Sequence, residues 1–205
     1  RHTRGKSTPD LLRLRAGDQM TLLDGTGMAY AVELREVSRE LVVGRIVVQE
    51  AIATEPRVQV ILYQGLLKAA KFEWIVQKGT EIGLSAIVPV QCLRSVVGAD
   101  DVSAAKLARW RAIAAEAAEQ SDRGRVPEVR EPVVLGWPHP VAPREPCSPS
   151  ADGERGIRLL AYEADGEVPR QTIRAVLAGI VPATIHLYIG PEGGFAPEEV
   201  ALAQA

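Results

Sequence analysis

The fold is decided by one stretch near the end of the chain, Leu187-Tyr188-Ile189-Gly190-Pro191-Glu192-Gly193-Gly194-Phe195. An apolar, β-branched run over 184–189 leads into it, and Pro197 followed by two acids marks the start of a helix. The pattern therefore predicts strand, glycine-rich loop, helix. In open α/β sheets this junction is where ligands bind. A tight turn that binds nothing would give the same pattern, so both interpretations stay open at this point.

Composition excludes several classes of protein. The chain has 205 residues, of which 46% are hydrophobic and 24% charged, which is typical of a globular protein of one or two domains. No apolar run is long enough to span a membrane, and no secretory signal stands at the start. Cys92, Cys147 and three scattered histidines have no metal-ligand spacing, so we expect no metal and favour a reduced, cytoplasmic setting.

The net charge of -2 gives no global case for a nucleic-acid partner, but basic residues gather locally. One group lies at the start of the chain and another at spacings of 3 and 7 on a predicted helix face. These candidates for RNA contact are Arg4, Lys6, Arg13, Arg15, Lys68, Lys71 and Lys78. A solvated surface would give similar patterns and is the more frequent explanation.

The pattern of predicted secondary structure changes near residue 58. Residues 11–50 contain short strands and turns, including Asp24-Gly25, which favour a small β-barrel, and residues 51–57 fit a linker. Beyond it, strands alternate with helices, which predicts a largely parallel sheet with helices on its faces. Ser103 is the expected N-cap of one helix and Gly83 the C-terminal cap of another. The expected strands are 58–63, 85–90, 157–162 and 184–189, the expected helices 68–82, 103–120, 168–177 and one beginning at Pro197, and 130–156 is expected to be irregular.

The loop at 190–194 is not a standard phosphate binder. It has neither Gly-x-Gly-x-x-Gly nor the lysine of a P-loop, and Glu192 would repel phosphate. A ligand with a neutral or cationic centre, such as a nucleoside, fits it better. If strands 157–162 and 184–189 are neighbours, residues 160–163 line the same edge of the sheet. Glu163 would then face a ribose or a cation, or would cap the next element.

The end of the second predicted helix carries a further polar group. Glu119, Gln120 and Arg123 could project together toward a polynucleotide or a substrate base. Equally, arginines near the negative end of a helix dipole have a sufficient structural reason to be there. No Gly-x-Ser-x-Gly or Ser/His/Asp pattern indicates nucleophilic catalysis.

Taken together, these stretches closely resemble the RsmE-type 16S ribosomal RNA uracil-N3 methyltransferases, which belong to the SPOUT class with a trefoil knot. The matching pieces stand in the family's order. They are 12–18, Asp24-Gly25, Lys71-Phe72-Glu73-Trp74-Ile75-Val76-Gln77-Lys78-Gly79-Thr80-Glu81-Ile82-Gly83, Glu119-Gln120-Ser121-Asp122-Arg123 with Val126-Pro127, and Ile189-Gly190-Pro191-Glu192-Gly193-Gly194. The resemblance covers nearly the whole chain apart from about 131–156.

The resemblance implies an α/β protein with a PUA-like, RNA-binding β-barrel over 1–53 and a SPOUT methyltransferase domain over 58–205. It implies a cytoplasmic homodimer in ribosome biogenesis, with S-adenosylmethionine (SAM) as cofactor and the 16S rRNA of the small ribosomal subunit as substrate. Arg123 and Glu119 become candidates for orienting the target base. The implied cofactor-binding residues are Leu160, Ala161, Tyr162, Glu163, Ile189, Gly190, Pro191, Glu192, Gly193 and Gly194.

Two other functions remain compatible with the sequence. One is a non-catalytic RNA-binding or ribosome-assembly protein built on the same two domains. The other is a SPOUT methyltransferase that acts on transfer RNA.

The family's third cofactor loop has no match here. It has the form Leu-Gly-x-Arg-(Ile/Val)-Leu-Arg-x-Glu-Thr and follows the helix that begins at Pro197, whereas this sequence stops at Ala205. The start departs too, because residues 1–10 do not resemble the family's first strand. We therefore expect an incomplete knot, and we expect these 205 residues alone not to bind SAM tightly. A calorimetric titration checks this, and tight binding would contradict it.

Overall fold

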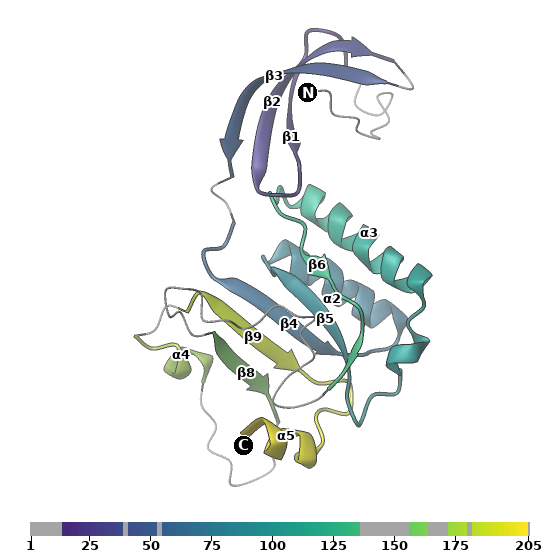
Figure 1. Cartoon of the computed structure of the whole chain (residues 1–205), viewed down its shortest axis with the longest axis vertical. Helices are drawn as coiled ribbons and strands as arrows, with labels where there is room; N and C mark the ends of the chain where they lie inside the picture. The colour runs from purple at the N-terminus through teal and green to yellow at the C-terminus, as the bar shows by residue number, and fades with distance from the viewer. Residues whose placement is uncertain are drawn as a thin grey trace. The chain divides into compact units, whose positions relative to one another are not determined.

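The computed structural model describes residues 14–38, 41–52, 55–135, 156–163, 172–179 and 182–204. The chain forms two compact units, which are drawn in Figure 1. The first comprises Arg1–Glu55 together with Asp122–Arg125, and the second comprises Pro56–Ser121 and Val126–Ala205. The short segment Asp122–Arg125 was not expected in the first unit, because it directly follows a helix of the second.

The described part of the first unit is an antiparallel sheet of three strands in the order β1-β2-β3. The strands are β1 (Gln19–Leu23), β2 (Met28–Val37) and β3 (Val42–Ala51). The predicted turn between β1 and β2 is present: one oxygen of Asp24 accepts hydrogen bonds from the backbone N–H and hydroxyl of Thr26. These bonds are the main reason that the pKa of Asp24 falls to about 2. The antiparallel sheet agrees with the expected β-domain, and its PUA-like closure stays a prediction.

The second unit is built on a parallel sheet in the order β6-β5-β4-β9-β8, with β7 pairing further along β5. This confirms the predicted α/β class. The sequences of the central strands are almost continuously apolar because both of their faces are covered. The strands are β4 (Gln59–Gly65), β5 (Ala86–Gln91), β6 (Glu128–Val129), β7 (Val133–Val134), β8 (Ile157–Ala161) and β9 (Thr184–Ile189).

The helix ends follow the predicted capping chemistry. The hydroxyl of Ser103 accepts a hydrogen bond from the Lys106 N–H at the start of its helix. Gly83 has φ of +102°, and the N–H groups of Gly83 and Leu84 donate to the carbonyls of Thr80 and Gly79, which is a complete Schellman motif. The helices are α2 (Ala69–Glu81), η1 (Ala99–Asp101), α3 (Ala104–Gln120), α4 (Ile173–Val176) and α5 (Pro197–Gln204).

Alternation along the strands supplies two hydrophobic layers. Leu62 and Ile87 pack with α2 and α3, where the Phe72 ring packs tilted against Trp110 with 4.2 Å between ring centroids. The next residues along the same strands, Tyr63 and Val88, lie in a second cluster with Phe195 and Val200 of the segment that enters α5. Consequently α2 and α3 cover one face of the sheet and α5 the other (Figure 1).

Three expectations need correction. The helical spacing of apolar residues over 68–82 predicts that Ile82 lies on the buried stripe with Phe72, but Ile82 is 78% exposed, because it is the C-cap residue, where the chain turns away. β3 runs on to Ala51, so the linker begins later than predicted. The short strand β7 lies inside 130–156, which was expected to be irregular, because it extends the edge of the sheet along β5. The first part of the helix expected over 168–177, and most of 136–156, lie outside the described residues.

Candidate functional site

The candidate site lies where β4 and β9 run side by side. The two strands are parallel neighbours, with Gln64 opposite Ile189 at their carboxyl ends. The chain leaves β4 toward α2 on one face of the sheet and leaves β9 toward α5 on the other. Such a topological switch point is where open α/β sheets bind ligands. The glycine-rich loop at 190–194 is therefore in the position expected of a binding loop.

Buried backbone contacts fix the loop at this point. Gln64 is 2% exposed, and its Nε2 donates hydrogen bonds to the carbonyls of Gly65 and Gly190, both at 3.1 Å. A Cβ on Gly65 would overlap the backbone nitrogen of Pro191. Gly194 has φ of +66°, and its N–H donates to the Pro191 carbonyl at 2.9 Å. Glycine is thus required at 65 by close approach and at 194 by backbone conformation.

Glu192 is tied to the start of α2. Its carboxylate lies 3.2 Å from Nζ of Lys71. The pKa of Glu192 is lowered, chiefly by its own backbone N–H; desolvation opposes this, and Lys71 and the N–H of Lys68 at the helix N-cap lower the pKa further. The acid that would repel a phosphate is therefore balanced by a cation and a helix N-terminus.

The second predicted loop lies at the same edge. β8 pairs in parallel with β9, and Ala161 is opposite Ile189, so both strands end together as expected. Leu160 and Tyr162 pack partly buried against the second hydrophobic cluster, while Glu163 is exposed. Residues 164–171 lie outside the described residues.

Two side chains that are not among the predicted site residues also hold the loop. Glu199 is 5% exposed and accepts hydrogen bonds from the N–H groups of Leu93 and Ala196 at 2.8 and 2.7 Å. Arg94 donates from Nη1 to the Gly193 carbonyl at 3.1 Å. A signal for Glu199 did exist, because it stands at the third position of a helix, where an acid commonly caps the N-terminus. Nothing local marks Arg94.

Cys92, the cysteine among the described residues, is buried and is not activated as a nucleophile. Burial, and then the negative charge of Glu199, raise the pKa of Cys92 to about 12, against a smaller opposite effect of the Ser95 hydroxyl. A thiol is reactive as thiolate, so this one is inert near neutral pH.

Of the two residues predicted to orient the base, Arg123 forms an ion pair with Glu55. Its side chain is 8% exposed and its Nη2 lies 2.7 Å from Oε2 of Glu55, within the first unit. Burial works to raise the pKa of Glu55, but the hydrogen bond and charge of Arg123 outweigh it and lower that pKa. Glu119 is exposed on α3, in the second unit. Their roles toward a base stay predictions.

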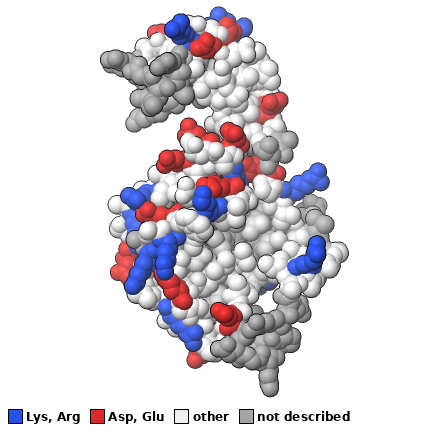
Figure 2. Space-filling model, turned by 180° about the vertical axis from the view of Figure 1, so that it is seen from behind, with Lys and Arg blue, Asp and Glu red and all other residues white. Residues whose placement is uncertain are grey.

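The predicted RNA-contacting residues are only partly within the described chain. Arg4, Lys6 and Arg13 lie outside it, whereas Arg15 and Lys68 are exposed. Nζ of Lys78 pairs with Glu81 at 2.8 Å. On the face shown in Figure 2, basic and acidic side chains of the second unit are interspersed. A continuous basic surface is therefore not seen on that face.

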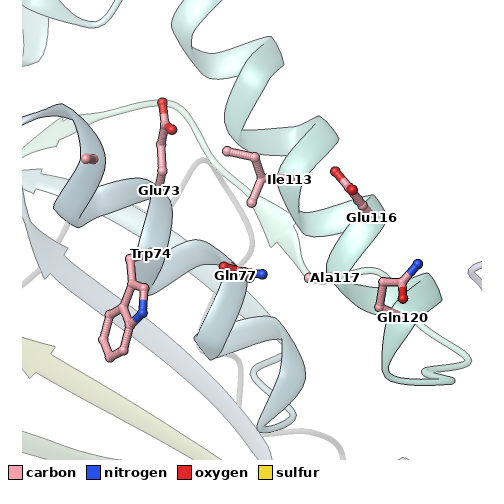
Figure 3. Close-up of a pocket in the computed structure, with 8 residues that line it drawn as sticks. Glu73, Trp74, Gln77, Ile113, Glu116, Ala117 and Gln120 are labelled. Atoms are coloured by element: carbon pink, nitrogen blue, oxygen red, sulfur yellow. The ribbon is translucent and has the colours of Figure 1, made fainter.

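A separate hollow of about 390 Å³ lies between α2 and α3 (Figure 3). Gln77 and Ile113 face each other across it, whereas the Trp74 ring points away from α3. Its two carboxylates disfavour a phosphate, and none of its residues belongs to the glycine loop. It is lined by Ala70, Glu73, Trp74, Gln77, Ile113, Glu116, Ala117 and Gln120.

The described residues contain no group of three or more His, Cys, Asp or Glu side chains that could hold a metal ion. None of the helices among them is both long and apolar enough to cross a membrane.

The fold and the loop define the class. A parallel sheet with a glycine-rich loop at its switch point is an α/β ligand-binding domain, and residues 54–205 match the model of the RNA methyltransferase domain family. The chain belongs to the ribosomal RNA small subunit methyltransferase E family, which confirms the resemblance found in the sequence.

Relatives and solved structures agree with this assignment. The chain is 32% identical to the Bacillus subtilis ribosomal RNA small subunit methyltransferase E over 93% of its own length and 72% of the relative's. For the Synechocystis enzyme the identity is 31%, over 95% of this chain and 59% of the relative. The chain thus spans between about three fifths and three quarters of these two relatives.

The structure of the Neisseria gonorrhoeae methyltransferase E bound to SAM is 25% identical, with a TM-score of 0.71 over 96% of this chain and 74% of that one. A Legionella pneumophila protein in complex with SAM is 27% identical, with a TM-score of 0.70 over 96% of this chain and 75% of that one. Both likenesses extend over nearly the whole chain, and both solved proteins hold SAM.

The close approach of the loop to β4 can be tested with Gly65→Ala. Because the new Cβ would overlap Pro191, we expect a loss of about 1–3 kcal/mol in the free energy of unfolding. The Gly194 N–H should also exchange faster with solvent. The matched control is Gly98→Ala, whose Cβ would have its nearest contact at 3.4 Å and should change stability by at most about 0.5 kcal/mol. Equal stability and exchange in both variants would contradict the packing described.

Proposed function

We propose that this protein transfers the methyl group of SAM to N3 of a uridine in the 16S rRNA of the small ribosomal subunit. The observation that carries the proposal is the glycine-rich loop held at the β4–β9 switch point by Gln64, in a chain of this methyltransferase family. Two solved relatives hold SAM, which supports the choice of cofactor.

The residues present fit this cofactor. The loop offers glycine backbone groups that a ligand can approach closely, and Ile189 and Tyr162 offer apolar surface for a base. Its carboxylate is balanced by Lys71, so the loop carries no net repulsion toward a zwitterionic ligand. Residues 189–194 and 160–163 would hold SAM, which when bound supplies a methyl carbon made electrophilic by the sulfonium.

The remaining work falls to the chain's own residues. Uracil N3 carries a proton that must leave at or before attack, so a base or an anion-stabilising donor has to face it. We retain Glu119 and Arg123 as the candidates for orienting the base. Because Glu55 holds the Arg123 guanidinium, Arg123 would present a fixed cation rather than a mobile one.

RNA binding is assigned to both units. Arg4, Lys6, Arg13 and Arg15 would contact phosphates from the first unit, and Lys68, Lys71 and Lys78 from the second. The target uridine must be presented unstacked, as for other enzymes that modify a base.

We also propose that the protein is a homodimer. Trp74 is 61% exposed and Ile82 is 78% exposed, and they stand eight residues apart along the helix that begins at Ala69. Trp74 lies on the side of α2 away from Phe72 and Val76 in the core, and Ile82 is the C-cap residue of the same helix. Exposed tryptophan on a helix face is typical of an interface.

The activity is tested by supplying SAM with a labelled methyl group and small ribosomal subunits that lack the modification. We expect N3-methyluridine in the 16S rRNA on nucleoside analysis, and no incorporation into subunits that already carry it. Labelled transfer RNA instead would contradict the proposed substrate. The absence of any product would favour a non-catalytic RNA-binding protein.

The dimer is tested by sedimentation velocity on Trp74→Glu. A charge at the centre of a desolvated interface is costly, so we expect the wild-type protein to sediment as a dimer and the variant as a monomer. Ile173→Glu is the control, because Ile173 is also exposed, at 60%, but lies on α4. A monomeric wild-type protein, or a variant that remains dimeric, would contradict the proposal.

A further inference from the structure

Glu199 joins two segments that are far apart in sequence. Its Oε2 accepts a hydrogen bond from the Ala196 N–H at the start of α5, and its Oε1 accepts one from the Leu93 N–H, just after β5. Capping of α5 needs only the first bond. The second bond contributes nothing to the helix, and it links the end of the glycine loop to the strand two places away in the sheet order.

A second contact links the same two segments. Arg94, the residue after Leu93, donates from Nη1 to the carbonyl of Gly193 inside the loop. The two chains approach closely here, since a Cβ on Gly193 would lie 3.3 Å from the Cβ of Arg94. The segment after β5 therefore holds the loop at two points, one inside it and one at its end.

The carboxylate lies in apolar surroundings. Phe195 and Val200, which flank Ala196 and Glu199 in the sequence, are buried together with Cys92 in the second hydrophobic cluster. Hydrogen bonds from N–H groups to a buried carboxylate are strong, and removing the acceptor leaves the donors unsatisfied. The link is therefore rigid, and it sets the position of Gly193 and Gly194 relative to the edge of the sheet.

We propose that Glu199 is a positioning residue for methyl transfer, which fastens the loop Gly190–Gly194 to the segment after β5 in the geometry that binds SAM, with Arg94 as its second attachment. This inference rests on the proposed function. Glu199 does not touch the reacting atoms in this role. It acts through the loop backbone, so its loss should weaken cofactor binding rather than slow the chemical step.

The test is Glu199→Gln, which keeps the size of the side chain but turns one acceptor into a donor that faces an N–H. We expect the KM for SAM to rise about tenfold, with kcat at saturating SAM within about twofold of wild type. Amide hydrogen exchange without SAM should become faster at Leu93, Gly194 and Ala196. The matched control is Glu198→Gln, because Glu198 is an exposed acid on the same turn, and it should change neither quantity.

Arg94→Ala keeps the proposal falsifiable if the first variant folds poorly, since Arg94 is exposed. We expect a KM for SAM raised about threefold, with Arg94→Lys restoring part of it. A purely structural role would lower thermal stability and the yield of active protein while leaving KM unchanged, and that result would overturn the proposal. Wild-type protein that methylates no RNA even at saturating SAM would instead refute the proposed function, and this role with it. Wild-type activity with unchanged KM in both variants would refute this role alone.

Discussion

The hydrogen bond from the Gln64 amide to the Gly190 carbonyl is the constraint on which the candidate site depends. It joins the carboxyl end of β4 to the first residue of the glycine loop. The bond is possible only because Gly65 has no side chain, which lets the backbone at Pro191 approach β4 closely. The parallel pairing of β4 with β9 brings the two backbones to the same height. The buried amide of Gln64, at the carboxyl end of an apolar strand, thereby has the hydrogen-bond partners that a buried polar group requires.

The rest of the second unit follows from covering the two faces of this sheet. Alternation along β4 and β5 sends Leu62 and Ile87 toward α2 and α3, and sends Tyr63 and Val88 toward the chain entering α5. Phe195 and Val200 flank the start of α5 and pack in the same cluster, which fixes the angle at which the helix leaves the loop. Gln64 of β4 and Lys71 of α2 therefore both hold the loop. Glu199 and Arg94 link it to the segment after β5. Binding geometry is set by packing on both faces, not by the loop sequence alone.

What the sequence could predict was local. The Ser103 cap, the Schellman motif at Gly83, the turn at Asp24 and the glycine loop each depend on residues a few positions apart, and periodicity or turn chemistry identifies them. Contacts across the sheet were not predictable in this way. Gln64 and Gly190 are separated by 126 positions, and Leu93 and Glu199 by 106, so no spacing rule brings them together. The prediction that Ile82 is buried was wrong for a related reason, because the spacing of apolar residues along a helix does not indicate where the helix ends.

Arg123 shows how a motif residue can have a structural reason that a sequence does not display. Glu55 binds its guanidinium and also accepts the Arg125 N–H, and the Gly27 N–H donates to the Gly124 carbonyl. The backbone of Gly124 packs closely there, since a Cβ would overlap the Ile52 side chain. Breaking a buried ion pair by removing one partner leaves the other charge uncompensated, which is strongly destabilising. Loss of activity on replacing Arg123 would therefore report the loss of this attachment within the first unit as well as any contact with a base.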